Sequence, residues 1–457
     1  MQKYKALILF VLCSSIIAAY IFSLCGESAA LTLEEAFETA LNNNPMLVEA
    51  RAGVEESKHA VDEARSYFFP RLDFSGNFSR TNNPPAVFSY KLGQEKFTRQ
   101  DFAIDSLNDP DPRSNFQSRF ILTQPIFNQG KEILGYKAAK VGRKVASLEQ
   151  RKRVQKVLFD VETAYYQVLL AQEAIKVMEA ALKAANGHFM LAKNRYKAGS
   201  ALKSDMLAAS VKAAEMEQGL AKAQGDFQVA MASLNAVMGV DQAREYSLEP
   251  PVSVTTLGAE GLEYWLSKAR ENRPEIKQVK NYIRLAKIDK KGAKLAFAPS
   301  LNLHGIYEAN TEDLFEADGD SWTIMATLSF NIFKGFGDKA RVAKADARLR
   351  KTRAMQQGIS DKVELEVREA YFGLLTAQKQ LEAAKRSVAQ ARESQTILKN
   401  RYENGMALMV ELLAADTALK EAELREATAR FNVRSAYAKL KWRAGLLDKQ
   451  GISKNVE

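Results

Sequence analysis

The sequence predicts a mainly α-helical protein that also carries four amphipathic β-strands, built from one structural unit used twice. Three observations support this fold class. The stretch NRYKAGSALKSDML at 194–207 recurs as NRYENGMALMVELL at 400–413. Long proline-free segments show the apolar period of coiled coils. Four short segments alternate apolar with polar residues, as half-buried strands do. With 46% hydrophobic and 26% charged residues, the 457-residue chain has the composition of a folded protein.

The N-terminus has the features of a secretory signal peptide. Two lysines precede an apolar run at 6–24, and small residues follow up to Ala30. This order predicts a signal peptide over 1–30 and cleavage after Ala30. One alternative is an uncleaved membrane anchor, for which the run is barely long enough. Another is lipidation of Cys25, which Leu24 disfavours because a small residue is wanted there. Cleavage after Ala30 removes both cysteines, so we expect neither a disulfide nor a thiolate metal site in the mature chain.

The repeat can be followed along the whole mature chain. Residues 33–78 align without gaps to 262–307, and residues 125–240 align to 331–446. A unit of about 200 residues is too long for a solenoid repeat, so we interpret it as a tandem duplication. The predicted organisation is a signal peptide (1–30), a first repeat (31–240), a linker (241–261), a second repeat (262–446) and a short tail (447–457).

Each repeat is predicted to begin with two helices and to continue with two strands. The helices are expected at 32–43 and 46–68 in the first repeat and at 262–272 and 275–297 in the second. Pro70 and Pro299 follow and end the helical pattern. Beyond them, one apolar and one polar face predict strands at about 70–80, 115–127, 299–309 and 321–333. The segments between paired strands, 80–115 and 308–320, are expected to be polar loops, and the acid-rich second one is expected to be solvated.

Very long helices follow the strands. From about 338 to 402 there is no proline, and small or apolar residues recur at alternating spacings of three and four, which predicts a coiled-coil seam. A helix of about 65 residues is on the order of 100 Å long. Gly199 and Gly405 are expected to end the long helices as left-handed residues. Helices at 203–238 and 408–444 then return antiparallel, so each RYxxG motif marks the tip of a helical hairpin.

The four strands suggest a membrane channel formed by several chains. Four strands cannot close a barrel, because about eight are the minimum. An open sheet with an apolar face would leave its edges unprotected. We therefore expect several chains to share one barrel, with the apolar face against lipid and the polar face lining a channel.

Other functional classes receive little support. The net charge is +10, but Lys and Arg alternate with Asp and Glu along helical stretches, which favours solvated helix faces over a nucleic-acid site. The three histidines are isolated and lack metal-ligand spacing. No phosphate loop, nucleophile elbow or paired carboxylates stand out. We expect no enzymatic activity, no cofactor and no nucleic-acid partner.

The whole mature chain resembles the TolC-like outer-membrane efflux proteins. The resemblance rests on NP at 44–45, the proline-led strand starts at Pro70 and Pro299, QPIFNQG at 124–130, FNIFKGFG at 330–337, and the paired hairpin tips. It implies a homotrimer with a twelve-stranded barrel in the outer membrane, continuous with a twelve-helix barrel that crosses the periplasm. It also implies a periplasmic adaptor and an inner-membrane pump as partners in efflux or secretion. The alternative is a secreted periplasmic coiled-coil scaffold or adaptor that forms no pore.

The resemblance also implies functional residues at the hairpin tips. The entrance positions are Ser204, Asp205, Tyr402 and Glu411, with the Tyr402 hydroxyl donating to Asp205. Glu411, repeated by symmetry, would form a carboxylate ring that favours cations. The implied adaptor contacts are Arg195, Tyr196, Gly199, Arg401 and Gly405. The alternative for Asp205 and Glu411 is the ordinary charge of a solvated helix.

The tips depart from the family pattern at two positions. Ala407 stands where the family's best-studied member has an arginine, and Ala414 stands where it has a second acid. We therefore expect fewer latches at this entrance and a single acidic ring. Asp416 lies nearby in the sequence and is a candidate substitute for the missing acid.

Overall fold

The computed structural model describes residues 30–250, 260–314 and 319–447. The predicted signal peptide with Cys25, the centre of the predicted linker and nearly all of the predicted tail lie outside the described residues. The remaining chain forms two compact units. The first takes residues up to Ala52, Leu148–Lys277 and the chain from Gly358 onwards, and the second takes Gly53–Ser147 and Gln278–Gln357. Each repeat contributes to both units, so the repeats and the compact units divide the chain differently.

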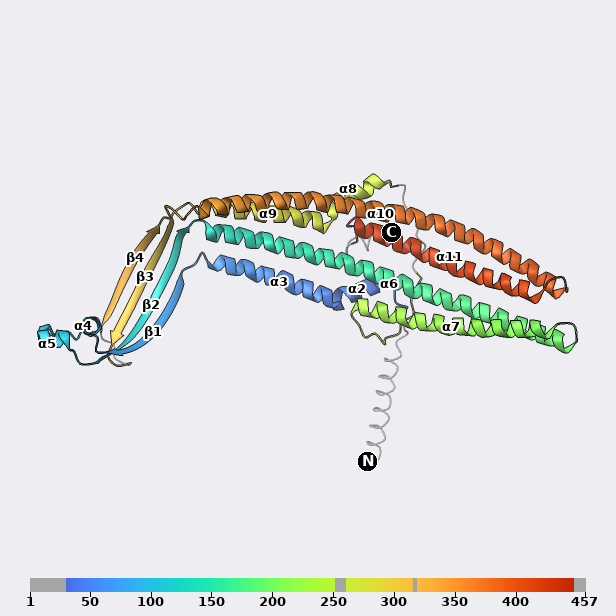
Figure 1. The fold of residues 1–457 in the computed structure, drawn as a ribbon, viewed down its shortest axis with the longest axis horizontal. Coiled ribbons are helices and arrows are strands. Elements are labelled where there is room, and N and C mark those ends of the chain that lie inside the picture. The colour runs from blue at the N-terminus through green and yellow to red at the C-terminus, as the bar shows by residue number, and fades with distance from the viewer. Residues whose placement is uncertain (1–29, 251–259, 315–318, 448–457) are drawn as a thin grey trace, which may run out of the picture. The chain divides into compact units, whose positions relative to one another are not determined.

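The second unit contains one four-stranded antiparallel sheet, in the order β1-β2-β3-β4 (Figure 1). Its strands are β1 (Arg71–Thr81), β2 (Arg113–Asn128), β3 (Ser300–Thr311) and β4 (Asp320–Ser329). All four predicted strands are confirmed. β4 ends at Ser329 and not at residue 333, because its pairing partner on β3 is the first residue, Ser300. The residue before Ser300 is Pro299, which has no N–H to extend the ladder.

One face of the sheet is apolar and exposed. The register places Phe74 opposite Phe120, Phe120 opposite Tyr307, and Tyr307 opposite Trp322. The Phe74 and Phe120 ring centroids lie 4.9 Å apart, and those of Phe120 and Tyr307 lie 6.5 Å apart. Even so, Phe74 is 62% exposed and Trp322 is 73% exposed. Aromatic residues that pair across neighbouring strands and still remain exposed form an apolar surface of the kind that is covered by another apolar surface.

The opposite face of the sheet is polar and hydrogen-bonded across the strands. Asn77 donates to Gln117 at 3.2 Å, and Gln117 donates to Glu308 at 2.8 Å. Arg119 forms an ion pair with Glu308 at 3.6 Å. The predicted division into one apolar face and one polar face is therefore confirmed.

The segment between β1 and β2 is more ordered than the predicted polar loop. It contains α4 (Pro84–Gly93), a short 3₁₀ helix η1 (Arg99–Phe102) and α5 (Ile104–Asn108). Phe97 stacks edge-on against Phe88 and Phe102, with centroids 4.8 and 5.1 Å away. The three rings pack on one another although Phe102 is 65% exposed. The polar residues around them in the sequence gave no sign of this cluster. The polar-loop prediction was wrong for these residues.

The helices that open each repeat are confirmed. They are α2 (Leu33–Asn43) and α3 (Pro45–Ser66) in the first repeat, and α8 (Leu262–Asn272) and α9 (Pro274–Leu295) in the second. Pro45 and Pro274, which directly precede the predicted second helices, are the first residues of α3 and α9. Proline is well tolerated there because the N–H of that position has no partner within the helix.

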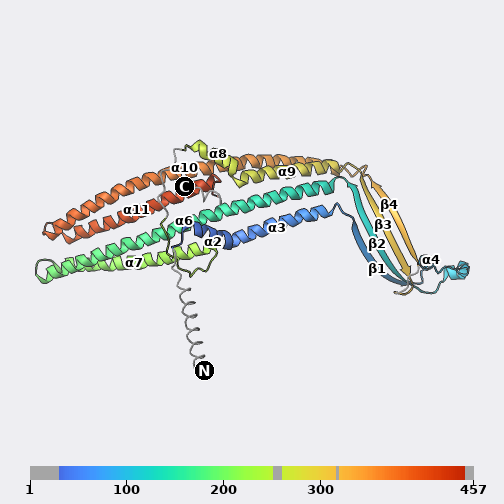
Figure 2. The ribbon, with the colours of Figure 1, turned by 180° about the vertical axis from the view of Figure 1, so that it is seen from behind.

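Two long hairpins complete the fold (Figure 2). The first hairpin is α6 (Lys131–Lys197) with α7 (Lys203–Met238), and the second is α10 (Gly337–Glu403) with α11 (Met409–Arg443). Gly199 and Gly405 adopt φ angles of 74° and 73°. Ser200 N–H donates to the carbonyl of Arg195 and Met406 N–H donates to that of Arg401, both at 2.8 Å. These bonds form Schellman caps, as predicted for the tip glycines.

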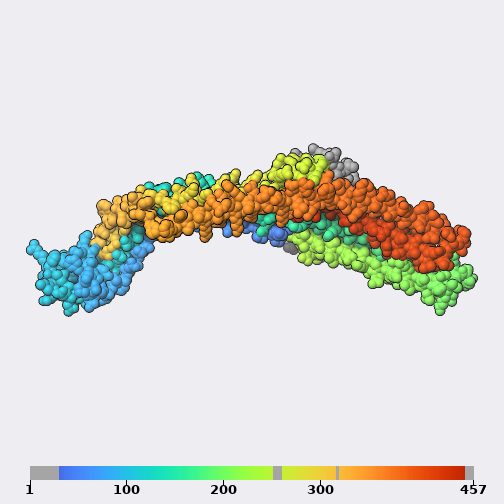
Figure 3. All heavy atoms as spheres, turned by 45° about the horizontal axis from the view of Figure 1, so that its top comes forward, coloured from blue at the N-terminus to red at the C-terminus, as the bar shows by residue number. Residues whose placement is uncertain are grey.

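The two hairpins pack together within the first unit, where the α6–α7 pair lies along the α10–α11 pair (Figure 3). The seam positions of α6 are buried, including Val161, Ala164 and Val168. Tyr165 is fully buried between them, and its hydroxyl lies 2.7 Å from the Leu31 carbonyl and 2.6 Å from that of Glu249. The predicted coiled-coil seam therefore forms the core of this unit.

Candidate functional site

The tips of the two hairpins share a small apolar core in the first unit. Ala192 and Ala209 come from the first hairpin, and the buried residues of the second hairpin are Tyr402, Met409, Leu412 and Leu413. Small residues on one side let the larger residues of the other side approach closely. The tip core thus holds the two hairpins together at the end where the repeated motif lies.

Arg195 connects the two tips by polar contacts. Its guanidinium donates to the carbonyl of Tyr402 at 3.0 Å and to that of Glu403 at 2.7 Å. The same group lies 4.9 Å from the centroid of the Tyr402 ring. The two carbonyls belong to the last turn of α10, where the helix offers no further N–H, and that of Tyr402 also accepts from Gly405 N–H at 3.0 Å in the tip loop. Arg195 therefore caps the C-terminus of a helix in the other hairpin, where a positive charge is favourable.

The predicted pair of Tyr402 and Asp205 is brought together in part. Tyr402 is only 5% exposed. Burial raises the pKa of its hydroxyl, the Arg195 charge lowers it, and the negative charge of Asp205 raises it further. Asp205 is thus within electrostatic range of Tyr402. Among the described residues, no hydrogen bond joins the Tyr402 hydroxyl to Asp205.

The other two predicted entrance residues lie at helix N-termini. The Glu411 carboxylate is exposed and accepts a hydrogen bond from Leu408 N–H at 2.9 Å, which caps the start of α11. Ser204 is exposed in the first turn of α7. Glu411 therefore has a structural role as a cap, and its exposed charge also remains available at the tip.

Asp416 faces the contact between the hairpins. Its Oδ2 atom lies 2.8 Å from Nε2 of His188, with side-chain exposures of 18% and 9%. Its other oxygen accepts from Gln395 at 2.9 Å. The side chain thus contacts residues of both α6 and α10 from its own place on α11. The sequence interpretation missed His188, although this histidine interrupts the apolar seam between Ala185 and Ala192.

Neither a metal-ligand cluster nor a membrane-spanning helix is found in the described part of the chain. Within residues 30–250, 260–314 and 319–447, no group of three or more His, Cys, Asp or Glu side chains could hold a metal ion. The helices of the same residues contain no stretch long and apolar enough to cross a bilayer. The residues at the tips hold the two hairpins together and expose charged side chains. This arrangement suits a role in holding helices together and letting them separate.

Comparison with known proteins identifies the family. The family model for outer membrane efflux proteins matches residues 36–240 and 265–445. The chain belongs to the outer membrane efflux protein family. It is 25% identical over 426 residues to protein CyaE of Bordetella pertussis, covering 92% of this chain and 85% of that protein. It is 23% identical over 443 residues to the alkaline protease secretion protein AprF of Pseudomonas aeruginosa, covering 95% and 88%.

A solved structure shows the same fold. The CmeC outer membrane channel of Campylobacter jejuni matches with a TM-score of 0.78 at 18% sequence identity, over 93% of this chain and 88% of that one. The family membership confirms the resemblance seen in the sequence. This protein is an outer-membrane exit channel with periplasmic helices. The family consists of transport channels and is not a class of enzymes.

Proposed function

We propose that three copies of this chain form one exit channel, which takes substrates from an inner-membrane pump and an adaptor across the periplasm. Four strands from each of three copies would make a twelve-stranded barrel. The observation that carries this proposal is the four-stranded sheet with one exposed apolar face and one polar face. Lipid would cover Phe74 and Trp322, and the network around Gln117 and Glu308 would line the channel. Pairing between copies would also protect the edge strands β1 and β4.

The hairpin tips form the periplasmic entrance in this proposal. Opening requires the first and second hairpins to separate. Separation breaks the hydrogen bonds from Arg195 to the carbonyls of Tyr402 and Glu403, and the contact between His188 and Asp416. Adaptor docking at Tyr196, Gly199, Arg401 and Gly405 would act on the same loops. A partner that binds the tips would therefore act on the hydrogen bonds that cap the end of α10 as well as on charged side chains.

Single-channel conductance in a planar bilayer tests the channel and its entrance. We expect a small, cation-preferring conductance, because Glu411 would present one carboxylate per copy. Glu411→Gln removes the charge and keeps an oxygen that accepts from Leu408 N–H, whereas Glu411→Ala removes both. Loss of cation preference in both variants assigns the effect to charge.

The matched control is Glu403→Gln, another exposed acid near the same tip. It should leave cation selectivity unchanged, because Glu403 lies at the end of α10 and outside the first turn of α11. A protein that stays soluble without detergent and never inserts into the bilayer would contradict the channel. That outcome would favour the scaffold alternative.

A further inference from the structure

The second unit contains a broad cationic groove close to the sheet. Its residues come from the start of α6, the end of α9 and the start of α10, and it encloses about 820 Å³. A volume of this size is typical of small-molecule sites. Five Lys and Arg side chains line the groove against two Asp side chains, so its formal net charge is +3.

Three of the five cations are left without a counter-charge. Arg341 pairs with Asp338 at 3.3 Å and Arg348 pairs with Asp289 at 3.1 Å, which uses both acids of the groove. The other cations, which are exposed and form no ion pair among the described residues, are Lys131, Lys334 and Lys344. An anion in the groove would therefore meet three positive charges that the groove itself does not neutralise.

The shape of the groove follows from a difference between the repeats. Arg341 and Lys344 of α10 correspond to Gly135 and Ala138 of α6, and all four residues line the groove. One helix thus carries long cationic side chains where the other carries almost no side chain. A Cβ at Gly135 would meet nothing within 4 Å. Glycine weakens a helix interior relative to alanine, and no packing contact within the chain requires it here.

The groove lies on the polar side of the sheet. Ser329 ends β4 on its polar face, and Asn331 continues the alternation two residues later. Asn331 lines the groove and donates to Asp338 at 2.8 Å. The exposed apolar residues nearby, Phe333 and Phe336, pack against each other with centroids 5.3 Å apart and do not line the groove. In the proposed channel the groove therefore opens to the lumen and away from lipid.

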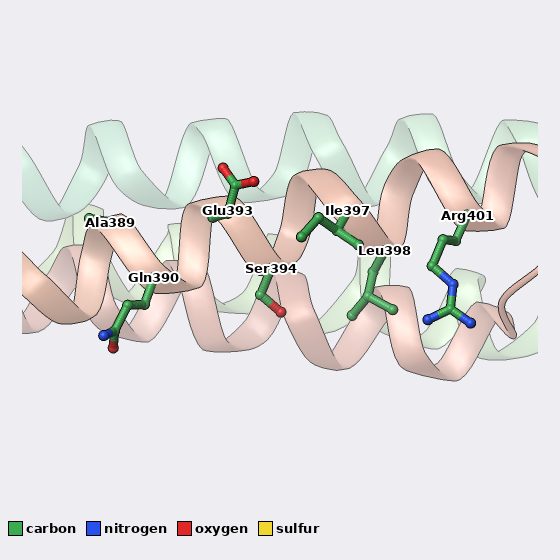
Figure 4. Close-up of a pocket in the computed structure, with 7 residues that line it drawn as sticks. All are labelled: Ala389, Gln390, Glu393, Ser394, Ile397, Leu398 and Arg401. Carbon is green, nitrogen blue, oxygen red and sulfur yellow. The ribbon is translucent and has the colours of Figure 1, made fainter.

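Another groove, near the tip end of α10 in the first unit, lacks this charge. Figure 4 shows its lining, which includes one acid, Glu393, and one cation, Arg401, beside the apolar residues Ile397 and Leu398. Arg401 also donates to the carbonyl of Met406 at 3.3 Å. Because its formal charges balance, this second groove offers an anion no comparable attraction.

We propose that the cationic groove binds small anions with two or more phosphate or carboxylate groups as they pass through the channel. Lys344 of α10, Lys334 just before that helix and Lys131 of α6 supply three separate positive charges. An anion with a single charge satisfies only one of them, so multiply charged anions are favoured. This inference rests on the proposed channel and adds a class of substrate that its wall can hold.

Isothermal titration calorimetry of the full-length, detergent-extracted protein tests the site. The ligands are tripolyphosphate and citrate, at low ionic strength because salt screens exposed charges, and without divalent cations because both ligands chelate them. We expect both to bind. Lys334→Gln/Lys344→Gln should weaken binding by about tenfold or more, the loss expected for at least one hydrogen bond to a charged group.

Two further variants separate a built groove from general positive charge. Lys291→Gln/Lys339→Gln removes two exposed lysines of α9 and α10 that do not line the groove, and it should bind both ligands as the wild type does. Gly135→Leu keeps every charge but fills open space in the groove, so it should also weaken binding. Equal weakening by the two double variants, with no effect of Gly135→Leu, would overturn the site. Far-ultraviolet circular dichroism checks that each variant is folded.

Conductance in a planar bilayer tests whether the groove faces the lumen. Tripolyphosphate should reduce the current of the wild type and have little effect on Lys334→Gln/Lys344→Gln. Binding in detergent without any block of the current would overturn the lumenal position. Protein that conducts but binds neither ligand would overturn the site and leave the channel intact. Protein that binds both ligands but never inserts would overturn the channel, and with it the role of the groove in transport.

Discussion

The two hairpin tips have nearly the same sequence and the same backbone, but their environments differ. Arg195 reaches across to the second hairpin through two hydrogen bonds, whereas Arg401 contacts only its own tip loop among the described residues. Tyr402 is buried and Tyr196 is 40% exposed. Duplication thus preserved the helix ends and their glycine caps. The arginine and the tyrosine are also the same in both tips, so the difference between the tips lies in what each of these side chains packs against.

A second pair of equivalent sites lies where the hairpins return to the opening helices. Asn44 donates to the carbonyl of Val237 at 2.7 Å, and Arg273 donates to that of Arg443 at 3.1 Å. Both donors follow the end of a short helix, and both reach the last turn of a hairpin helix. Arg273 also contacts Glu275 at 2.9 Å and Glu366 at 2.8 Å. The second repeat therefore replaces one neutral hydrogen bond by a buried charge network.

This difference leads to the largest expected effect on stability. Arg273→Ala should lower the free energy of unfolding by about 3–5 kcal/mol, because it removes the buried guanidinium that lies between Glu275 and Glu366 and leaves Glu366 with Arg443, at 2.9 Å, as its partner. Asn44→Ala should cost about 1–3 kcal/mol, since it leaves one carbonyl unsatisfied. Urea unfolding of the detergent-solubilised protein, followed by far-ultraviolet circular dichroism, measures both. Equal costs would show that the charge network adds nothing to the backbone contact.

The glycines at helix ends give a smaller contrast. Gly239 and Gly199 both have a φ of 74°, so alanine at either position costs about 1–2 kcal/mol of backbone strain. At Gly239 a Cβ would also meet the carbonyl oxygen of Asn43 at 2.6 Å, whereas at Gly199 nothing lies within 4 Å. Gly239→Ala should therefore lower the urea midpoint more than Gly199→Ala. A larger loss at the tip would mean that an additional contact surrounds Gly199 in the assembly.

The internal joint at the tips can be weakened at His188. His188→Ala leaves the Asp416 carboxylate partly buried with Gln395 as its remaining partner, so we expect a loss of about 1–3 kcal/mol. The matched control is Ser394→Ala at the equivalent position of the second hairpin, which should have almost no effect within one chain. Limited proteolysis at the tip loops reports on local opening. Equal protease sensitivity of the two variants would contradict a stabilising role for the pair.

The sequence predicted the elements of this fold well because the repeat doubled every signal. Each strand, hairpin and tip glycine appeared twice, with the same periodicity and the same cap residues. The site was predicted less completely. Asp416 was treated as a candidate acid of the entrance, and His188 was missed, because pairing between helices far apart in sequence does not follow from periodicity. The capping role of Glu411 was readable in principle, since an acid in the third position of a helix often accepts from the N-cap N–H.

The last contrast concerns one position of the long helices. Glu162 of α6 is 3% exposed, and its equivalent on α10 is Arg368, which pairs with Glu364 at 2.8 Å on a more exposed surface. Burial raises the pKa of Glu162, while Lys441 and Tyr166 partly oppose this shift. An acid whose pKa is raised on folding is protonated more readily in the folded state. Its contribution to stability is therefore present at low pH and is lost as the pH rises through the folded-state pKa.

Glu162→Gln removes this dependence, because glutamine keeps the size of the side chain and carries no charge. We expect the variant to exceed the wild type in urea midpoint at about pH 8 and to match it more closely at about pH 4, where glutamate is near its ordinary pKa. Glu179→Gln, an exposed position on the same helix, should show no such change with pH. A wild type that is the more stable of the two at about pH 8 would mean that attraction to Lys441 outweighs the cost of burying the charge. In that case Glu162 would stabilise the fold through its ion pair with Lys441, as Arg368 does through Glu364. The two equivalent positions would then differ only in the sign of their charge.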